Sequence, residues 1–174
     1  MTRILLLDDE ANILNSLKRL LKPQGWQVDT FTRVDNALQA LLEHEYAAIL
    51  SDYQMPTADG VTYLQFAKQK QPDAIRMVLS AYGDRASMIK AINQAEVYRY
   101  LSKPWDDYEL VAAVKSAIEL YHLHRENQHL REENDRQRAQ LKAREEELLR
   151  LEAESPGITR VYRDQDGSVL LKNH

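Results

Sequence analysis

The sequence predicts an α/β fold in which a five-stranded parallel, doubly wound sheet is followed by a long C-terminal helix. Short apolar runs alternate with helical segments five times within residues 1–121. The runs 4–7 and 46–50 are apolar throughout, as in strands buried on both faces of a parallel sheet. Repeated strand–helix units build such a sheet through right-handed crossovers. No glycine or proline occurs from Trp105 to Ser155, which favours one continuous helix.

Turn and capping residues set the limits of the predicted elements. Pro23 and Gly25 end the first helix, Thr32 with Asp35 caps the second, Asp84 caps the fourth, and Asp106 with Asp107 opens the fifth. The predicted strands span 4–7, 26–31, 46–50, 74–79 and 97–101. The apolar positions of the first four helices are Ile13, Leu14, Leu17, Leu20 and Leu21; Val34, Ala37, Leu38, Leu41 and Leu42; Val61, Leu64 and Ala67; and Met88, Ile89 and Ile92.

Polar side chains follow four of the predicted strands. A sheet in the order 2-1-3-4-5 brings the carboxyl ends of strands 1, 3, 4 and 5 to one edge, where α/β folds bind ligands. The residues expected to converge there are Asp8, Asp9, Asp52, Ser80 and Lys103.

Each of these residues has a simpler reading. Asp52 alone could be a loop or cap residue, and Asp8-Asp9-Glu10 could be acidic residues at a helix N-terminus. Ser80 could be a loop hydroxyl and Lys103 a solvated lysine. Adjacent carboxylates repel one another and need water or a cation, so their convergence favours a site.

This pattern resembles the receiver domain of two-component response regulators, a flavodoxin-like fold. The resemblance covers residues 1 to about 121. It rests on Asp8-Asp9, on Asp52 with Met55-Pro56 and Gly60 downstream, on Ser80-Ala81, and on Tyr100 three residues before Lys103-Pro104. It implies that Asp52 accepts a phosphoryl group from a histidine kinase, that the Lys103–Pro104 bond is cis, and that Gln54 and Tyr82 tune the phosphate lifetime.

A carboxylate nucleophile and an anionic phosphoryl donor need a divalent cation between them. Mg²⁺ prefers an octahedron of oxygens. We expect Asp9, Asp52 and the backbone carbonyl of Gln54 to bind it directly and Asp8 to act through water, with Mn²⁺ as a substitute. Lys103 pairs with a phosphoryl oxygen.

Signalling requires a second conformation. A hydrogen bond from Ser80 to the phosphoryl group, present only after phosphorylation, is expected to open space for Tyr100. The simpler reading of Tyr100 is a common strand aromatic.

The last third of the sequence predicts that the fifth helix continues as a coiled coil over residues 122–154. Asparagine at a positions favours two parallel strands, so we expect a parallel homodimer; a solvated helix is the alternative. Ser155-Pro156-Gly157 ends the helix, and the tail 155–174 is expected to contain a β-hairpin. The heptad places Leu120, Asn127, Asn134, Leu141 and Leu148 at a, and Leu123, Leu130, Gln137, Arg144 and Leu151 at d.

Composition and charge argue against several classes of function. A net charge of −4 offers no basic field for nucleic acid, and no cysteine is present for a disulfide or a thiolate site. No apolar run approaches the roughly 18 residues of a membrane helix, so a cytoplasmic protein without membrane contact is expected.

Three functions remain. The first is a phosphorylation switch, not an enzyme, whose output is protein contact through the dimeric coil, with a histidine kinase upstream and an unknown partner downstream. The second is the regulatory part of a longer protein, for example a cyclic-dinucleotide phosphodiesterase or cyclase. The third is a metal-dependent phosphatase with Asp8 as nucleophile, although D-x-D-x-T does not follow the first strand.

Overall fold

The computed structural model describes residues 1–56, 59–81, 89 and 93–157. It contains one parallel sheet in the order β2-β1-β3-β4-β5, which confirms the predicted topology. The cis geometry expected for the Lys103–Pro104 bond is also present. The strands are β1 (Arg3–Leu7), β2 (Gln27–Phe31), β3 (Ala48–Asp52), β4 (Ile75–Ala81) and β5 (Arg99–Lys103).

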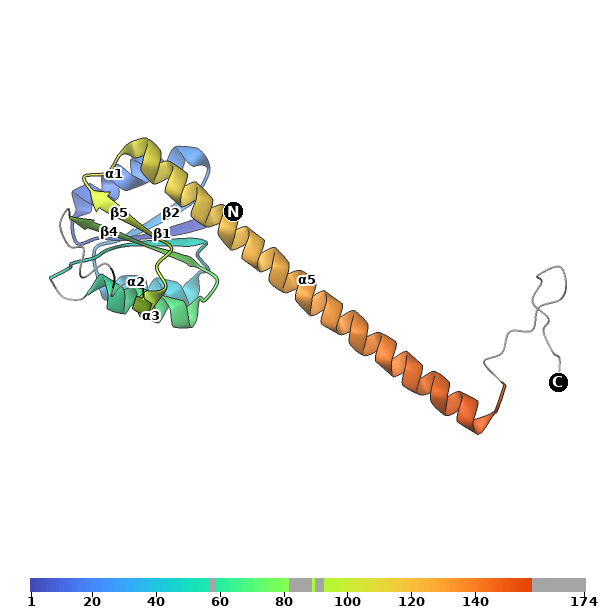
Figure 1. The fold of residues 1–174 in the computed structure, drawn as a ribbon. Helices are drawn as coiled ribbons and strands as arrows, with labels where there is room; N and C mark the ends of the chain where they lie inside the picture. The colour runs from blue at the N-terminus through green and yellow to red at the C-terminus, as the bar shows by residue number, and fades with distance from the viewer. Residues whose placement is uncertain (57–58, 82–88, 90–92, 158–174) are drawn as a thin grey trace. The chain divides into compact units, whose positions relative to one another are not determined.

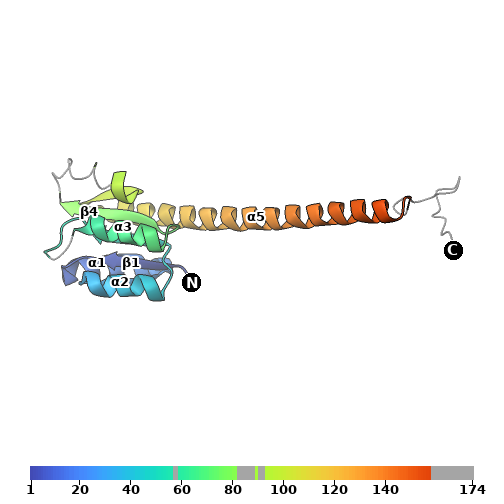
Figure 2. The ribbon, with the colours of Figure 1, turned by 90° about the horizontal axis from the view of Figure 1, so that it is seen from below.

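Helices cover both faces of the sheet. The helix α1 and the first part of α5 lie on one face, and α2 and α3 lie side by side on the other (Figure 1 and Figure 2). The predicted fourth helix, with Asp84, Met88 and Ile92, lies mostly outside the described residues. The helices are α1 (Ala11–Leu21), η1 (Lys22–Gln24), α2 (Val34–Glu43), α3 (Gly60–Lys70) and α5 (Asp107–Glu154).

Alternating side chains of the strands give the sheet two cores. In β1, Ile4 and Leu6 pack toward α1 and α5, whereas Leu5 and Leu7 pack toward α2 and α3. All four side chains are at most 1% exposed. Because both faces of the strand are buried, its sequence is apolar without alternation.

Three local expectations need correction. Strands β3, β4 and β5 each end two residues later than predicted, because parallel pairing continues through Asp52↔Leu79 and Ala81↔Lys103; backbone pairing does not require apolar side chains. Thr32 is not a helix cap: Arg33 occupies the N-cap of α2 without a side-chain cap bond. Leu42 is 61% exposed rather than part of the core.

Arg76 is a buried cation near the start of β4. Its guanidinium donates to the backbone carbonyls of Ala95 at 2.9 Å and Ala74 at 2.6 Å, and more weakly to those of Pro72 and Glu96. Burial lowers the pKa of this guanidinium, while Glu96 raises it. The side chain thereby joins β4 to the segment that precedes β5.

We expect Arg76→Met to lower the free energy of unfolding by about 2 kcal/mol, because buried carbonyls lose their donors. Urea denaturation measures the change. The exposed Arg99, in the neighbouring strand, gives the matched control Arg99→Met. Equal stability of the two variants would contradict the role assigned to Arg76.

The chain divides into two compact units, residues 1–126 and 127–174, and α5 contributes to both. The helix begins where Asp106 accepts the backbone N–H of Glu109, and it ends at Glu154, before Pro156 and Gly157, as predicted. The expected hairpin in the tail lies outside the described residues. In the described part of the chain, no helix combines the length and apolarity needed to span a membrane.

Candidate functional site

Three carboxylates meet at the carboxyl edge of the sheet. Asp52 ends β3, and Asp8 and Asp9 follow β1, its neighbour in the sheet. One oxygen from each of the three lies within 4.8 Å of the other two. Asp8 is 1% exposed and Asp52 is 7% exposed, so two of these charges are largely removed from water. Their convergence follows the prediction made from the strand ends.

Lys103 supplies the cation that faces these carboxylates. Its Nζ lies 2.6 Å from Asp8 Oδ2 and 3.1 Å from Asp52 Oδ1. Lys103 is the last residue of β5 and the two aspartates belong to the ends of β1 and β3, so the contact spans the sheet edge. The ammonium therefore offsets part of the negative charge of the two buried carboxylates.

The two aspartates after β1 differ in accessibility. Both carboxylate oxygens of Asp8 are engaged, because Oδ1 accepts the backbone N–H of Glu10 at 2.9 Å and Oδ2 contacts Lys103. Asp9 is exposed and lines a cavity of about 620 Å³ above Asp52. Gln54 and Met55 line the same cavity.

The negative charge of the three carboxylates exceeds the positive charge of Lys103 at this site. Burial raises the pKa of the Asp52 carboxyl, Lys103 lowers it, and Asp8 and Asp9 raise it, so the net direction is upward. Burial lowers the pKa of Lys103, but its hydrogen bonds to Asp8 and Asp52 raise it above the usual value of a lysine. One lysine does not fully offset three carboxylates, and the site therefore favours an additional cation.

An oxygen-only, anionic donor set fits Mg²⁺ by its chemistry. Asp9 and Asp52 reach the open cavity, and the backbone of Gln54 pairs with Asp59 beside it. Among the described residues, this is the cluster of acidic side chains close enough together to hold a metal ion.

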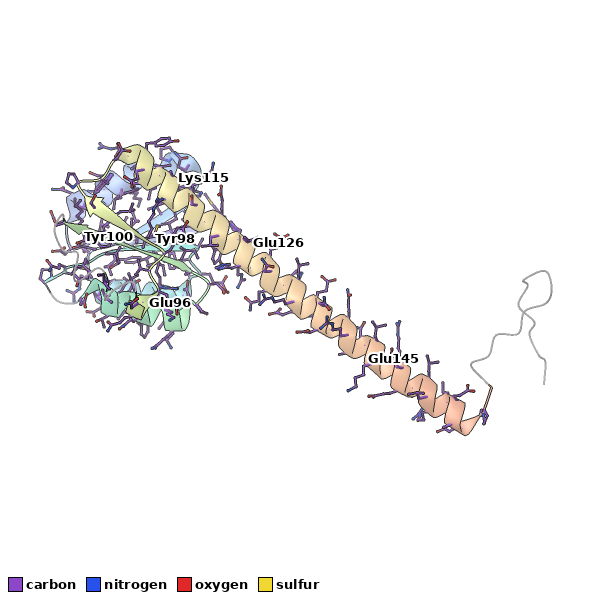
Figure 3. All side chains as sticks on the ribbon, in the orientation of Figure 1. Glu96, Tyr98, Tyr100, Lys115, Glu126 and Glu145 are labelled. Carbon is purple, nitrogen blue, oxygen red and sulfur yellow. The ribbon has the colours of Figure 1, made fainter. Side chains whose placement is uncertain are left out.

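Ser80 and Tyr100 occupy neighbouring strands near this edge. Ser80 is 3% exposed, and its hydroxyl donates to the carbonyl of Ala81 at 3.3 Å. Tyr100, labelled in Figure 3, lies in β5 and is directly paired with Val78. It is half-buried against the core on the α2 and α3 face. The position Tyr82, two residues after Ser80, lies outside the described residues.

Two residues of the site were not assigned a role from the sequence. Gly60 opens α3 so close to β3 that an added Cβ would overlap the backbone carbonyl oxygen of Asp52. The buried Ser51 hydroxyl donates to that same carbonyl at 3.0 Å. The spacing between Asp52 and Gly60 was visible in the sequence, but the close approach depends on how α3 packs.

We expect Gly60→Ala to displace Asp52 or α3, which lowers stability by about 1–3 kcal/mol and slows reaction at Asp52 by about tenfold or more. Denaturation and labelling with a small phosphodonor measure the two effects. Gly25→Ala is the control, because Gly25 has a φ of 84° with open space around it, far from the site. That variant should lose stability but keep its labelling rate; equal labelling rates in both variants would contradict the prediction.

Comparison with known proteins agrees with this geometry. The family model of the response regulator receiver domain matches residues 4–115. The hydrogenase transcriptional regulatory protein HoxA of Bradyrhizobium diazoefficiens is 38% identical over 128 residues, which are 72% of this chain and 26% of HoxA. The chain spans about a quarter of the length of such curated relatives.

Solved structures extend the similarity. The signal receiver domain of an HD domain-containing protein from Pseudomonas fluorescens Pf-5 has 39% identity and a TM-score of 0.69, covering 72% of this chain and 92% of that one. The beryllofluoride-activated NtrC4 receiver domain dimer has 32% identity and a TM-score of 0.65, covering 70% and 99%. The fold, the acidic edge and these matches lead to one conclusion: the chain belongs to the response regulator receiver domain family.

Proposed function

We propose that this chain is a phosphorylation switch in which Asp52 accepts a phosphoryl group from a histidine kinase and the output is protein contact. The observation that carries the proposal is the convergence of Asp8, Asp9, Asp52 and Lys103 at the carboxyl edge of the sheet. Receiver domains are regulatory and bind Mg²⁺ in an acidic pocket of this kind. The test is the gain of one phosphoryl group per chain from a small phosphodonor with Mg²⁺, argued further below.

In the proposed reaction an Asp52 carboxylate oxygen attacks the phosphorus in line. The new bond forms as the bond from phosphorus to the donor's imidazole nitrogen breaks, and that nitrogen takes a proton from solvent. When bound, Mg²⁺, or Mn²⁺ in its place, would neutralise the repulsion between the carboxylate and the phosphoryl oxygens. Asp9, Asp52 and the Gln54 carbonyl would hold the ion, and Asp8 would act through water.

The Lys103 ammonium would have different partners before and after phosphorylation. Before phosphorylation its ammonium pairs with Asp8 and Asp52. After phosphorylation it would move to a phosphoryl oxygen, leaving Asp8 free to orient the metal's water. A lysine suits both places, because a flexible stem carries a compact charge with three donors.

Ser80 would couple phosphorylation of Asp52 to a conformational change in the rest of the domain. Its hydroxyl currently donates to the Ala81 carbonyl, an ordinary local bond that a phosphoryl oxygen would replace with a stronger, charge-assisted one. Because Ser80 and Tyr100 lie in paired strands, a shift at the end of β4 would reach Tyr100 through β5.

We expect Ser80→Ala to accept phosphate at a rate within a few fold of wild type but to lose the phosphorylation-dependent change in hydrogen exchange across β4 and β5. Exchange of both proteins, with and without phosphodonor, measures the change. Ser102→Ala is the matched control, since Ser102 is the exposed partner of Ser80 in the sheet. A wild-type response in Ser80→Ala would show that the hydroxyl is not the relay.

The second part of the proposal is a parallel homodimer through residues 120–151. Leu123, Leu130, Leu141 and Leu148 are each more than half exposed along α5, and all occupy a or d positions of the heptad. Exposed leucines at a and d positions of one helix are the pattern that a second coiled-coil helix covers, and polar residues interrupt this seam at Asn127, Asn134, Gln137 and Arg144. The solved NtrC4 receiver is itself a dimer, although that similarity does not extend to the coil.

Charge favours the parallel alignment in the first half of the coil. A parallel pair brings g residues near the next e residues of the other helix, so Glu126 meets Arg131 and Glu133 meets Arg138. Farther along, Glu147 meets Glu152, which is repulsive. Exposed ion pairs contribute only a few tenths of a kcal/mol each, so leucine burial must dominate.

A second candidate is that the chain regulates an output domain in a longer protein. Two observations favour it: the matched residues are only about a quarter of HoxA, and a similar solved receiver comes from an HD domain-containing protein. A cyclic-dinucleotide phosphodiesterase or cyclase would be an output of this type. The full reading frame of the gene would distinguish the two proposals.

A further inference from the structure

The last turn of α5 within the first unit contacts three segments at the amino edge of the sheet, opposite the acidic site. The Arg125 guanidinium lies 3.7 Å from Glu45 Oε2 and 3.7 Å from Asp73 Oδ2. His122 Nε2 lies 3.2 Å from Thr2 Oγ1. Thr2, Glu45 and Asp73 precede β1, β3 and β4, respectively. One helical turn is therefore tied to the beginnings of the three central strands.

Tyr121 lies one helical turn before Arg125 on α5 and is the apolar residue beside these polar contacts. It is half-buried and packs against the core shared by α1 and α5. Together with Arg125 and Asp73 it lines a small cavity of about 160 Å³. We call Tyr121, His122 and Arg125, with Thr2, Glu45 and Asp73, the amino-edge latch. Its apolar part is Tyr121, and its charged part is the Arg125 guanidinium, whose two terminal nitrogens each lie within ion-pair distance of a different carboxylate.

Leu123 lies on the other side of the same turn. It is two residues from both Tyr121 and Arg125, and residues of an α-helix advance by about 100° each, so Leu123 is about 200° around the helix from them. Its side chain is 54% exposed. The contacts that tie this turn to the sheet thus also orient Leu123 away from it.

We propose that Arg125 is a positioning residue: through Glu45 and Asp73 it fixes the rotation of this turn, so that Leu123 is presented to a second copy of the chain. The inference rests on the proposed homodimer for its purpose, but the latch itself is a property of the single chain. Because one guanidinium makes both ion pairs, a single substitution removes both of them while Tyr121 remains in place.

Hydrogen exchange of the full chain tests the latch without reference to dimerisation. In Arg125→Ala, amides 121–126 (Glu126 is labelled in Figure 3) should exchange roughly two- to fivefold faster than in wild type, as expected for loss of two exposed ion pairs. Alanine favours helix more than arginine, so intrinsic propensity acts in the opposite direction. Arg136→Ala, an exposed arginine later in α5, is the control. Equal exchange at 121–126 in the two variants would overturn the proposal.

Cross-linking tests the consequence for the dimer. The chain has no cysteine, so Leu123→Cys creates a single reporter. Disulfide formation between two copies should slow roughly two- to fivefold when Arg125→Ala is added, and should change less with Arg125→Lys, which keeps the charge. High salt should slow disulfide formation more in the Leu123→Cys chain than in the chain that also carries Arg125→Ala, because in the latter only the ion pairs between the two helices remain to be screened.

The two hypotheses fail differently. A chain that is monomeric by light scattering and does not cross-link would refute the homodimer, while the exchange experiment would still decide the latch. A dimer that cross-links at the same rate with and without Arg125 would refute the latch and leave the homodimer intact.

Discussion

Asp52→Asn is expected to abolish phosphorylation. With a small phosphodonor and Mg²⁺, the wild-type chain should gain one acid-stable, base-labile acyl phosphate, and the variant should gain none. An amide is a much weaker nucleophile than a carboxylate and a poor ligand for Mg²⁺, so both parts of the reaction are lost. Intact mass and base lability measure the product.

Asp59→Asn is the matched control for that experiment. Asp59 lines the same cavity, and its carboxylate accepts the backbone N–H of Val61 at the N-cap of α3. Asparagine caps helices as well as aspartate does, so the fold is retained while one nearby charge is removed. Labelling should persist in this variant. Undiminished labelling of Asp52→Asn would place the acceptor elsewhere and would revive Asp8 as the nucleophile.

Asp52→Asn should also stabilise the folded protein when Mg²⁺ is absent. The pKa of Asp52 is raised by burial and by Asp8 and Asp9, despite Lys103. Between the unfolded pKa of 3.8 and the higher folded value, the folded chain binds more protons than the unfolded chain. Stability therefore falls as pH rises through that window, and the deficit persists at neutral pH. Asp52→Asn removes it, so the melting temperature should rise by a few degrees; Mg²⁺ should shrink the difference.

The fold could be predicted because its strands are buried on both faces. Runs such as Ile4–Leu7 have no polar side to confuse with a helix, and the strand–helix alternation leaves few topologies. The acidic edge followed from the same reasoning, since parallel strands deliver their carboxyl ends together. Asp8, Asp52 and Lys103 therefore met as expected.

The features that could not be predicted from the sequence depend on contacts between elements that are distant in the chain. Nothing in the local pattern shows that Arg76 reaches the Ala95 carbonyl, or that Gly60 touches the backbone of Asp52. Strand ends were misjudged because Ser80 is polar yet still paired in β4. Thr32 was expected to cap α2, but the helix begins one residue later with no side-chain cap.

The dimer should dissociate when Leu130 and Leu141 are both replaced with glutamate. Each leucine buried in a seam contributes about 1.5–3 kcal/mol, and a homodimer loses each contact twice. Burying a carboxylate in the seam adds an unfavourable term. The dissociation constant should therefore rise by on the order of 10³-fold or more. Light scattering at micromolar concentration should report a dimer for the wild-type chain and a monomer for the variant.

Leu149 provides the control that separates seam burial from loss of leucine. It is 72% exposed on the same helix but lies outside the a and d positions, so Leu149→Glu should leave the dimer intact. Glu133→Gln should also change little, because exposed ion pairs contribute weakly. Dissociation by Leu149→Glu would place the contact on a different face of α5. A monomeric wild-type chain, or cross-links that pair opposite ends of the helix, would refute the parallel coil.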